Sequence, residues 1–238
     1  MTDRSARAPV WARPDARTSR RALSRELIVR SAIELADRDG LDAVSIRRVA
    51  AALDARPMSL YSHVPAKDDL LDLMFDELAA RSLLGADRPT AWEPALRAIA
   101  HRVRAVGLAH PWSIELLSRR LQLGPNVMRL LDEWVAALDP LRLPPGQAWS
   151  IVTAVNDYVT GYVNREAAQR RAVPADATQA RRWRREVGAY LTDLAASGSY
   201  PHIAPLLQEG YATAPDNFEV GLDWIIASIK ASRRGRTR

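Results

Sequence analysis

The chain has 238 residues, and 47% of them are hydrophobic, so it can bury a core and is not globally disordered. It contains no cysteine, which excludes disulfides, thiolate metal sites and cysteine nucleophiles. Its net charge of +6 comes from the ends, because residues 1–25 carry seven Arg against two Asp and residues 230–238 carry five basic residues and no acid. Two basic chain ends of this kind indicate contact with a polyanion. Alternatively, they are tails that only increase solubility.

Apolar runs are short throughout the sequence. None reaches the roughly 18 residues that a membrane-spanning helix needs. The first residues, Met-Thr-Asp-Arg-Ser-Ala-Arg, contain no apolar secretion signal. We therefore expect a cytoplasmic protein without a membrane partner.

The first predicted helix covers residues 24–38. Ile28, Ala32 and Leu35 recur at helical spacing and would form its buried side. Ser24 is the expected N-cap, and Gly40 is the expected stop, because glycine accepts the backbone conformation that follows a helix.

Two short helices and a longer one follow. Ser45 is the expected cap of the first short helix, whose buried side would be Ile46, Val49, Ala50 and Leu53. Residues 54–56 form a tight connection, and Pro57 opens the next helix, 57–64, at a position where proline is tolerated. The longer helix covers 67–82, with Asp68 and Asp69 in its first turn, where they complement the helix dipole.

Composition changes beyond Gly85, and residues 87–90 are expected to form a boundary loop. Further helices are predicted at about 92–109, 112–121, 125–138, 145–171, 178–196 and 216–230. Prolines are expected between these helices, at 111, 125, 140, 144, 145, 174, 201, 205 and 215. The sequence shows no alternating β-branched runs and no hairpin turns, so the predicted fold class is all-α.

The segment from Val44 to Lys67 indicates DNA binding. Two short helices joined by a tight turn, with a longer helix before them, are typical of a helix-turn-helix motif, here about 45–64. Its second helix carries small, hydroxylated and aromatic side chains and no acid, as a helix in the major groove requires. Segment 44–67 holds four basic residues against one Asp, whereas 68–77 holds five acids and no base. Only one edge of this region therefore suits DNA.

Residues 24–82 resemble the tetracycline-repressor (TetR) family of bacterial regulators. The resemblance rests on the capped first helix ending in Asp39-Gly40-Leu41, on Ser45 with Arg47, and on the run Leu60-Tyr61-Ser62-His63-Val64 followed by Lys67. Two positions depart from the family. Asp54 replaces the usual turn glycine but tolerates positive φ better than most residues. Ala66 replaces the usual polar cap, so the start of the fourth helix should fray more.

The resemblance implies which residues face DNA. Tyr61, His63 and Lys67 would hold phosphates, whereas Arg47 and positions 57–59 would contact bases. Tyr61 and Met58 could instead pack, and His63 could be an ordinary surface histidine. The predicted DNA-contacting residues are Arg47, Arg48, Arg56, Pro57, Met58, Ser59, Tyr61, Ser62, His63 and Lys67.

The later part is similar to the family's ligand-sensing domain, through Trp92-Glu93, His110-Pro111-Trp112, residues 123–126 and residues 218–224. The resemblance implies an effector pocket and a four-helix dimer interface formed by the helices near 145–171 and 216–230. Each pocket candidate could equally be ordinary core, and Asp157 could cross the dimer interface. The candidates are Trp112, Leu116, Leu117, Met128, Leu131, Trp134, Trp149, Val152, Asn156, Tyr158, Val159 and Tyr162.

The predicted domains are a basic arm at 1–22, a DNA-binding domain at 23–84, an effector-binding and dimerisation domain at 88–230, and a basic tail at 231–238. The predicted function is a homodimeric repressor that binds a palindromic DNA operator and is released by a small hydrophobic or aromatic effector. An activator or a ligand-independent DNA-binding protein is the alternative. An enzyme is disfavoured, because the sequence has no nucleophile elbow, phosphate loop or paired histidines. Neither a cofactor nor a metal is expected.

Overall fold

The computed structural model describes residues 23–119, 121–208 and 216–234, and every regular element within these ranges is helical. The predicted all-α fold class is therefore confirmed. The chain divides into two compact units, residues 1–163 and residues 164–238, and the division falls inside a long helix. The predicted arm at 1–22 and the last four residues of the predicted tail lie outside the described residues.

The first unit begins with three helices, α1 (Arg25–Asp39), α2 (Ile46–Ala52) and α3 (Pro57–Tyr61), with a 3₁₀ turn at Leu41–Ala43. The hydroxyl of Ser24 accepts a hydrogen bond from the backbone N–H of Leu27, and that of Ser45 accepts one from Arg48, both at 3.2 Å. Gly40, with φ of 84°, ends α1. Both predicted caps and the predicted stop are confirmed.

Helix α3 is shorter than predicted and ends at Tyr61 rather than residue 64. The backbone N–H groups of His63 and Val64 both bond to the carbonyl of Leu60, which closes the helix in a turn. Pro65 follows directly, and a residue that precedes proline is disfavoured in the helical conformation. The recognition segment, which is the predicted second helix of the helix-turn-helix motif at residues 57–64, is therefore helical over Pro57–Tyr61 and continues in this turn.

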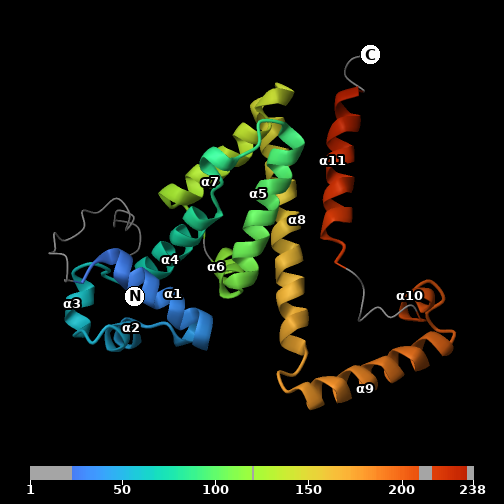
Figure 1. The fold of residues 1–238 in the computed structure, drawn as a ribbon, viewed down its shortest axis with the longest axis horizontal. Helices are drawn as coiled ribbons and strands as arrows, with labels where there is room; N and C mark the ends of the chain where they lie inside the picture. Colours follow the sequence, from blue (N-terminus) through green and yellow to red (C-terminus); the bar gives the residue numbers. More distant parts are fainter. Residues whose placement is uncertain (1–22, 120, 209–215, 235–238) are drawn as a thin grey trace. The chain divides into compact units, whose positions relative to one another are not determined.

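Helix α4 (Lys67–Ser82) packs on α1 and leads from the first three helices to α5 and α7 (Figure 1). Its start, at Ala66, has no side-chain cap, as the sequence predicted. The core between α1 and α4 also takes up two side chains from α6, Trp112 and Leu116. Leu60 and Val64 are fully buried there, as expected, whereas Leu53 is only partly buried and packs at its edge.

The rest of the first unit consists of α5 (Trp92–Ala109), α6 (Trp112–Arg119), α7 (Pro125–Ala137) and the beginning of α8 (Pro145–Ala172), with 3₁₀ turns at Gly85–Asp87 and Asp139–Leu141. Pro125 and Pro145 occupy the first helical position of α7 and α8, where the missing N–H costs nothing. Each predicted helix in this region is present, within two residues of its predicted ends.

The second unit holds the end of α8 together with α9 (Ala177–Ala196), α10 (Ala204–Gln208) and α11 (Phe218–Arg234). Asp176 caps α9 by accepting hydrogen bonds from the backbone N–H groups of Thr178 and Gln179. The sequence did not predict α10, and Pro205 lies in its first turn rather than between helices. Helix α11 continues to Arg234, so the first residues of the predicted tail are helical.

Candidate nucleic-acid interface and ligand cavity

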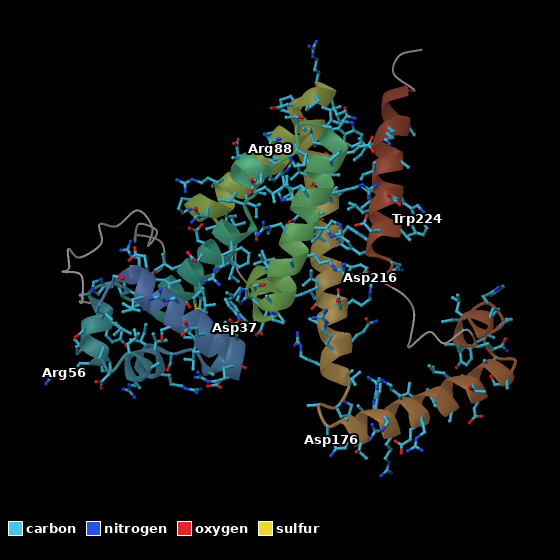
Figure 2. All side chains as sticks on the ribbon, viewed as in Figure 1. Asp37, Arg56, Arg88, Asp176, Asp216 and Trp224 are labelled. Carbon is cyan, nitrogen blue, oxygen red and sulfur yellow. The ribbon has the colours of Figure 1, made fainter. Side chains whose placement is uncertain are left out.

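The α2–α3 region presents the predicted DNA-contacting side chains on its surface. Nine of the ten predicted residues are exposed, and His63 is the exception. Met58 and Tyr61 are the largest of them, with 76% and 42% of their surface accessible. Arg56 lies at the outer edge of this group of helices (Figure 2). An exposed, basic and aromatic face of this kind can contact base edges and phosphates.

The turn between α2 and α3 depends on Asp54, which adopts φ of 49°. Glycine is the usual residue in such a conformation, but the short polar side chain of aspartate is tolerated there. The backbone N–H of Ala55 then bonds to the carbonyl of Ala50, 2.9 Å away. The predicted turn therefore forms without glycine and sets α3 across the end of α2.

Arg48 makes an ion pair with Asp39 at the end of α1. The guanidinium of Arg38, together with that of Arg48, holds the pKa of the Asp39 carboxyl below its usual value of 3.8. Asp39 therefore remains ionised at neutral pH and keeps Arg48 next to α1. Arg47 lies exposed on α2 and has no ion-pair partner within the described part of the chain. Of these two arginines, Arg47 is the one better placed to contact a base.

His63 is nearly buried, with 5% of its surface exposed. It lies in the turn that closes α3, between Leu60 and the buried Val64. Periodicity does not reveal this burial, because His63 lies beyond the last helical residue. Its contact with phosphate stays a prediction, and such a contact would have to use the small part of the ring that remains accessible.

A cavity of about 630 Å³ lies among α4, α5, α6, α7 and α8, and all of its lining residues belong to the first unit. This volume is typical of pockets that hold drug-sized molecules. Most of the wall is apolar, and several hydroxyl and amide groups interrupt it. The lining residues are Phe75, Leu78, Ala79, Ser82, Val103, Val106, Gly107, Ser113, Ile114, Leu117, Leu121, Gln122, Val127, Leu130, Leu131, Trp134, Trp149, Val152, Thr153, Asn156, Asp157, Val159, Thr160 and Val163.

The structure brings part of the predicted pocket set together. The predicted residues that line the cavity are Leu117, Leu131, Trp134, Trp149, Val152, Asn156 and Val159. Trp112 and Leu116 instead belong to the core around α1 and α4. Met128 is exposed on α7. Tyr158 and Tyr162 pack against each other, and Arg104 lies over the Tyr162 ring, 5.0 Å from its centre.

Sequence reasoning missed the contribution of α4 and of the segment after α6. Phe75, Leu78 and Ser82 of α4 line the cavity, as does Gln122. The α4 residues share an apolar face that the sequence assigns equally well to a core. Gln122 lies outside any helix, so helical spacing could not identify it.

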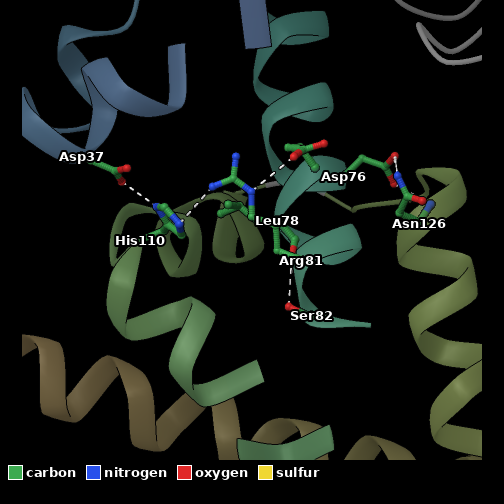
Figure 3. A network of polar contacts seen from close by, with 8 residues as sticks. Asp37, Asp76, Leu78, Arg81, Ser82, His110 and Asn126 are labelled. Atoms are coloured by element: carbon green, nitrogen blue, oxygen red, sulfur yellow. Dashed lines mark hydrogen bonds and ion pairs between the residues drawn. The ribbon is translucent and has the colours of Figure 1, made fainter. Parts of the chain in front are cut away.

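A buried carboxylate joins α4 to α7. Asp76 is 6% exposed, and its Oδ1 accepts hydrogen bonds from the backbone N–H groups of Asn126, at 2.8 Å, and Val127, at 3.1 Å. Its Oδ2 accepts a third, at 2.8 Å, from the side-chain amide of Asn126 (Figure 3). Asp76 therefore caps the N-terminus of a helix fifty residues away in sequence, where a negative charge is favourable.

Glu133 of α7 makes the reciprocal connection. Its carboxylate accepts hydrogen bonds from the backbone N–H groups of Leu84 and Gly85, just after α4, with the shortest at 2.8 Å. Both ends of the contact between α4 and α7 are thus fixed by carboxylates that accept backbone hydrogen bonds. These contacts connect α4 to the α7 wall of the cavity at both ends.

A second link joins α1 to the connection between α5 and α6. Oδ1 of Asp37 lies 2.7 Å from Nδ1 of His110 and accepts a 2.7 Å hydrogen bond from the indole N–H of Trp112. Nη1 of Arg81, from α4, lies 3.5 Å from the other ring nitrogen of His110 (Figure 3). The helices that carry the exposed basic face are thus joined by polar contacts to those that surround the cavity.

Among the described residues there is no group of three or more His, Asp or Glu side chains that could hold a metal ion. A search of the same residues found no helix with the length and apolar character needed to cross a membrane.

Two family models match the chain. Residues 28–74 match "Bacterial regulatory proteins, tetR family", and residues 85–233 match "Tetracyclin repressor-like, C-terminal domain". The second match begins two residues before the boundary loop predicted at 87–90 and therefore includes that loop. The division into domains stays a prediction.

Curated relatives support the same assignment. The chain is 34% identical over 220 residues to the HTH-type transcriptional repressor DrrR1 of Streptomyces coeruleorubidus, covering 90% of this chain and 81% of that one. It is 30% identical over 232 residues to an HTH-type transcriptional regulator of Saccharopolyspora erythraea, covering 97% and 95%.

Solved structures are similar as well. ActR of Streptomyces coelicolor in complex with actinorhodin gives a TM-score of 0.73 at 29% identity, covering 89% of this chain and 99% of that chain. Apo ActR gives a TM-score of 0.72 at 28% identity, covering 91% and 98%.

Proposed function

The chain belongs to the tetR family of bacterial regulatory proteins and is a transcriptional regulator rather than an enzyme. We propose that it is a repressor that binds a palindromic operator as a homodimer. A small, largely apolar effector that occupies the α4–α8 cavity would release it from the operator. The structure of ActR in complex with actinorhodin supports the proposal of a small-molecule effector. The exposed face of α2–α3 supports the operator part.

One observation carries the proposal: helix α4 takes part in both sites. Its first residue, Lys67, is exposed beside the recognition segment, while Phe75, Leu78 and Ser82, farther along, line the cavity. A ligand that occupies the cavity therefore contacts the same helix that positions the DNA-contacting residues. An effector acts only if it binds one arrangement of this helix better than the other.

A homodimer would supply the operator affinity that a single recognition helix lacks. Helix α3 has five residues, and operator affinity in helix-turn-helix proteins comes from two such helices in successive major grooves. Helix α11 offers a surface for a second copy, because Trp224, labelled in Figure 2, is exposed on it. Val220 of the same helix is exposed as well. Burial of such side chains against a partner would remove apolar surface from water.

The direct test is a gel shift with the intergenic DNA beside the protein's own gene. We expect binding by the dimeric protein at low salt, with its mass in solution checked by light scattering, and release when a cavity ligand is added. An absence of any shift by dimeric protein at low salt, with no effector present, would overturn the proposal.

Lys67→Ala should weaken binding to every DNA sequence by about tenfold and reduce the salt dependence, because it removes a phosphate contact in each subunit. In a dimer, the slope of log K against log salt should become less negative by about 2. The measurement is a titration of fluorescent DNA at several salt concentrations. Arg129 is an exposed basic residue of α7, so Arg129→Ala is the matched control and should leave the slope unchanged. An unchanged slope for the Lys67 variant would contradict its assignment.

Arg47→Ala should change sequence preference more than overall affinity for DNA. An arginine that contacts a base edge contributes about 1–3 kcal/mol of discrimination at that position. The measurement is a selection from randomised operator sequences, with Arg48→Ala for comparison, since Arg48 is already paired with Asp39. If both variants selected the same sequences as the parent chain, neither arginine would be a base-reading residue.

A further inference from the structure

Asp39, the last residue of α1, binds two arginines, and one of them, Arg48, belongs to the exposed α2–α3 face. Oδ2 of Asp39 pairs with Nη2 of Arg48, in the first turn of α2. Its Oδ1 accepts a hydrogen bond of 3.1 Å from Nε of Arg38, whose Nη2 lies 3.4 Å from Oδ2. A single carboxylate therefore engages two guanidinium groups.

The backbone fixes the positions from which Asp39 and Arg48 meet. Gly40, with φ of 84°, ends α1 directly after Asp39 and confines the carboxylate to the last turn of that helix. The hydroxyl of Ser45 accepts a hydrogen bond from the backbone N–H of Arg48, which fixes the start of α2. The pair joins two different helices, so it depends on the fold of the DNA-binding region and not on neighbouring residues alone.

Asp39 is poorly placed to stabilise α1. The C-terminus of a helix carries a partial negative charge, so a carboxylate there is unfavourable. Exposed ion pairs contribute little to stability, and the side chains of Arg38 and Arg48 are 66% and 50% exposed. The two pairs therefore do little more than offset an unfavourable position. The main effect of Asp39 is on the two arginines, whose charges it neutralises.

This neutralisation matters most for DNA that is not the operator. An arginine must leave the carboxylate before it can bind a phosphate, and the carboxylate itself repels the DNA backbone. Non-specific binding consists almost entirely of phosphate contacts, and a flexible arginine can reach a phosphate wherever the protein sits on the duplex. In an operator complex, base contacts also hold the protein at one position, where a released arginine gains only if a phosphate lies within its reach.

We propose that Asp39 is a specificity-determining residue, which limits binding to non-operator DNA by holding Arg38 and Arg48 away from its phosphates. The effect on non-operator DNA requires only a DNA-binding protein, whereas the comparison with an operator rests on the proposed function. Two other roles predict different results. If Asp39 directed Arg48 toward a phosphate, its removal would weaken binding, and if the pairs were only surface contacts, its removal would change nothing.

The test is a titration of a short fluorescent duplex of random sequence with the full-length protein at several salt concentrations. Asp39→Asn keeps the shape of the side chain and removes its charge. We expect binding about tenfold tighter at low salt. The slope of log K against log salt should become more negative by about 1–2 for each subunit in contact, because each arginine that gains a phosphate adds about 0.9.

Asp42→Asn is the matched control. Asp42 is an exposed acid in the 3₁₀ turn after α1, and it pairs with no arginine within the described ranges. Its replacement removes the same charge nearby without releasing an arginine, so the affinity should change by less than about twofold.

A second background separates release of the arginines from loss of a negative charge. In a chain that carries both Arg38→Gln and Arg48→Gln, Asp39→Asn should tighten binding to the random duplex by less than about twofold. Circular dichroism checks that each variant is folded. Unchanged or weaker binding by the Asp39→Asn variant of the parent chain, or a gain that persists in the glutamine background, would overturn the inference.

The operator fragment from the gel shift supplies the last comparison. Asp39→Asn should tighten binding to this fragment by less than about threefold, so the preference for operator over random duplex should fall by about threefold. A larger gain on the operator than on the random duplex would also contradict the inference. A chain that shifts no intergenic fragment would overturn the proposed repressor alone, and the random duplex would then decide whether Asp39 restrains the two arginines.

Discussion

Replacing Asp76 with Ala should lower the free energy of unfolding by about 3 kcal/mol, because hydrogen bonds to a charged acceptor and a helix cap are lost together. The carboxylate accepts three hydrogen bonds from Asn126 and Val127. Without it, the backbone N–H groups at the start of α7 lose their acceptor in a nearly buried site. The measurement is urea denaturation followed by circular dichroism.

Glu77→Ala is the matched control, since Glu77 is the next residue on α4 and also carries a carboxylate. It forms an exposed ion pair with Arg81 one turn away, and pairs of this kind contribute about 0.3–0.5 kcal/mol. Asp76→Asn should fall between the two, because it retains an oxygen for the backbone N–H groups and loses the charge. A loss below about 1 kcal/mol for Asp76→Ala would show that the cap of α7 is not a main stabilising contact.

The helices could be predicted from the sequence because their signals are local. Ser24, Ser45 and Gly40 determine helix ends within a few residues of themselves, and the structure shows the predicted bonds and φ value. Helix α4 begins and ends at the predicted residues, as does α5. Even the unusual Asp54 turn followed from the known tolerance of aspartate for positive φ.

The site could be predicted only in part, because its remaining features depend on contacts between distant segments. Asp76 belongs to a run of acids along α4, and nothing in that run shows that one of them caps α7. Trp134 was predicted to line the cavity, but only coordinates show that its indole N–H is buried with no hydrogen-bond partner among the described residues. Likewise, Trp112 resembled a pocket residue by type and spacing, yet it packs in the core around α1 and α4.

The contact that Asp76 makes also explains the glycine at position 124. A Cβ at this position would lie 2.0 Å from Oδ1 of Asp76 and 2.5 Å from its Cγ, distances at which atoms must move apart. The backbone itself would accept alanine, because Gly124 has φ of −66° and ψ of 157°. Glycine is therefore required here by the approach of the carboxylate and not by backbone conformation.

Gly124→Ala should accordingly lower the free energy of unfolding by about 2–3 kcal/mol, because the new methyl group pushes Asp76 away from the N–H groups it caps. Gly146→Ala is the matched control. It lies just after Pro145 at the start of α8, a Cβ there has no neighbour within 4 Å, and helix propensity should raise stability by about 0.5–1 kcal/mol. Both values follow from urea denaturation.

The double variant distinguishes the carboxylate from the surrounding packing. With Asp76→Ala already present, the atoms nearest to the new methyl group are gone and the remaining Cβ of residue 76 lies 2.8 Å away, which a small shift relieves. Gly124→Ala should then cost less than about 1 kcal/mol, so that the two substitutions are coupled by about 2 kcal/mol. Additive losses would mean that the methyl group clashes with something other than the carboxylate. Coupling of this size would establish that one buried acid fixes the joint between the helix that carries Lys67 and the helix that carries Trp134.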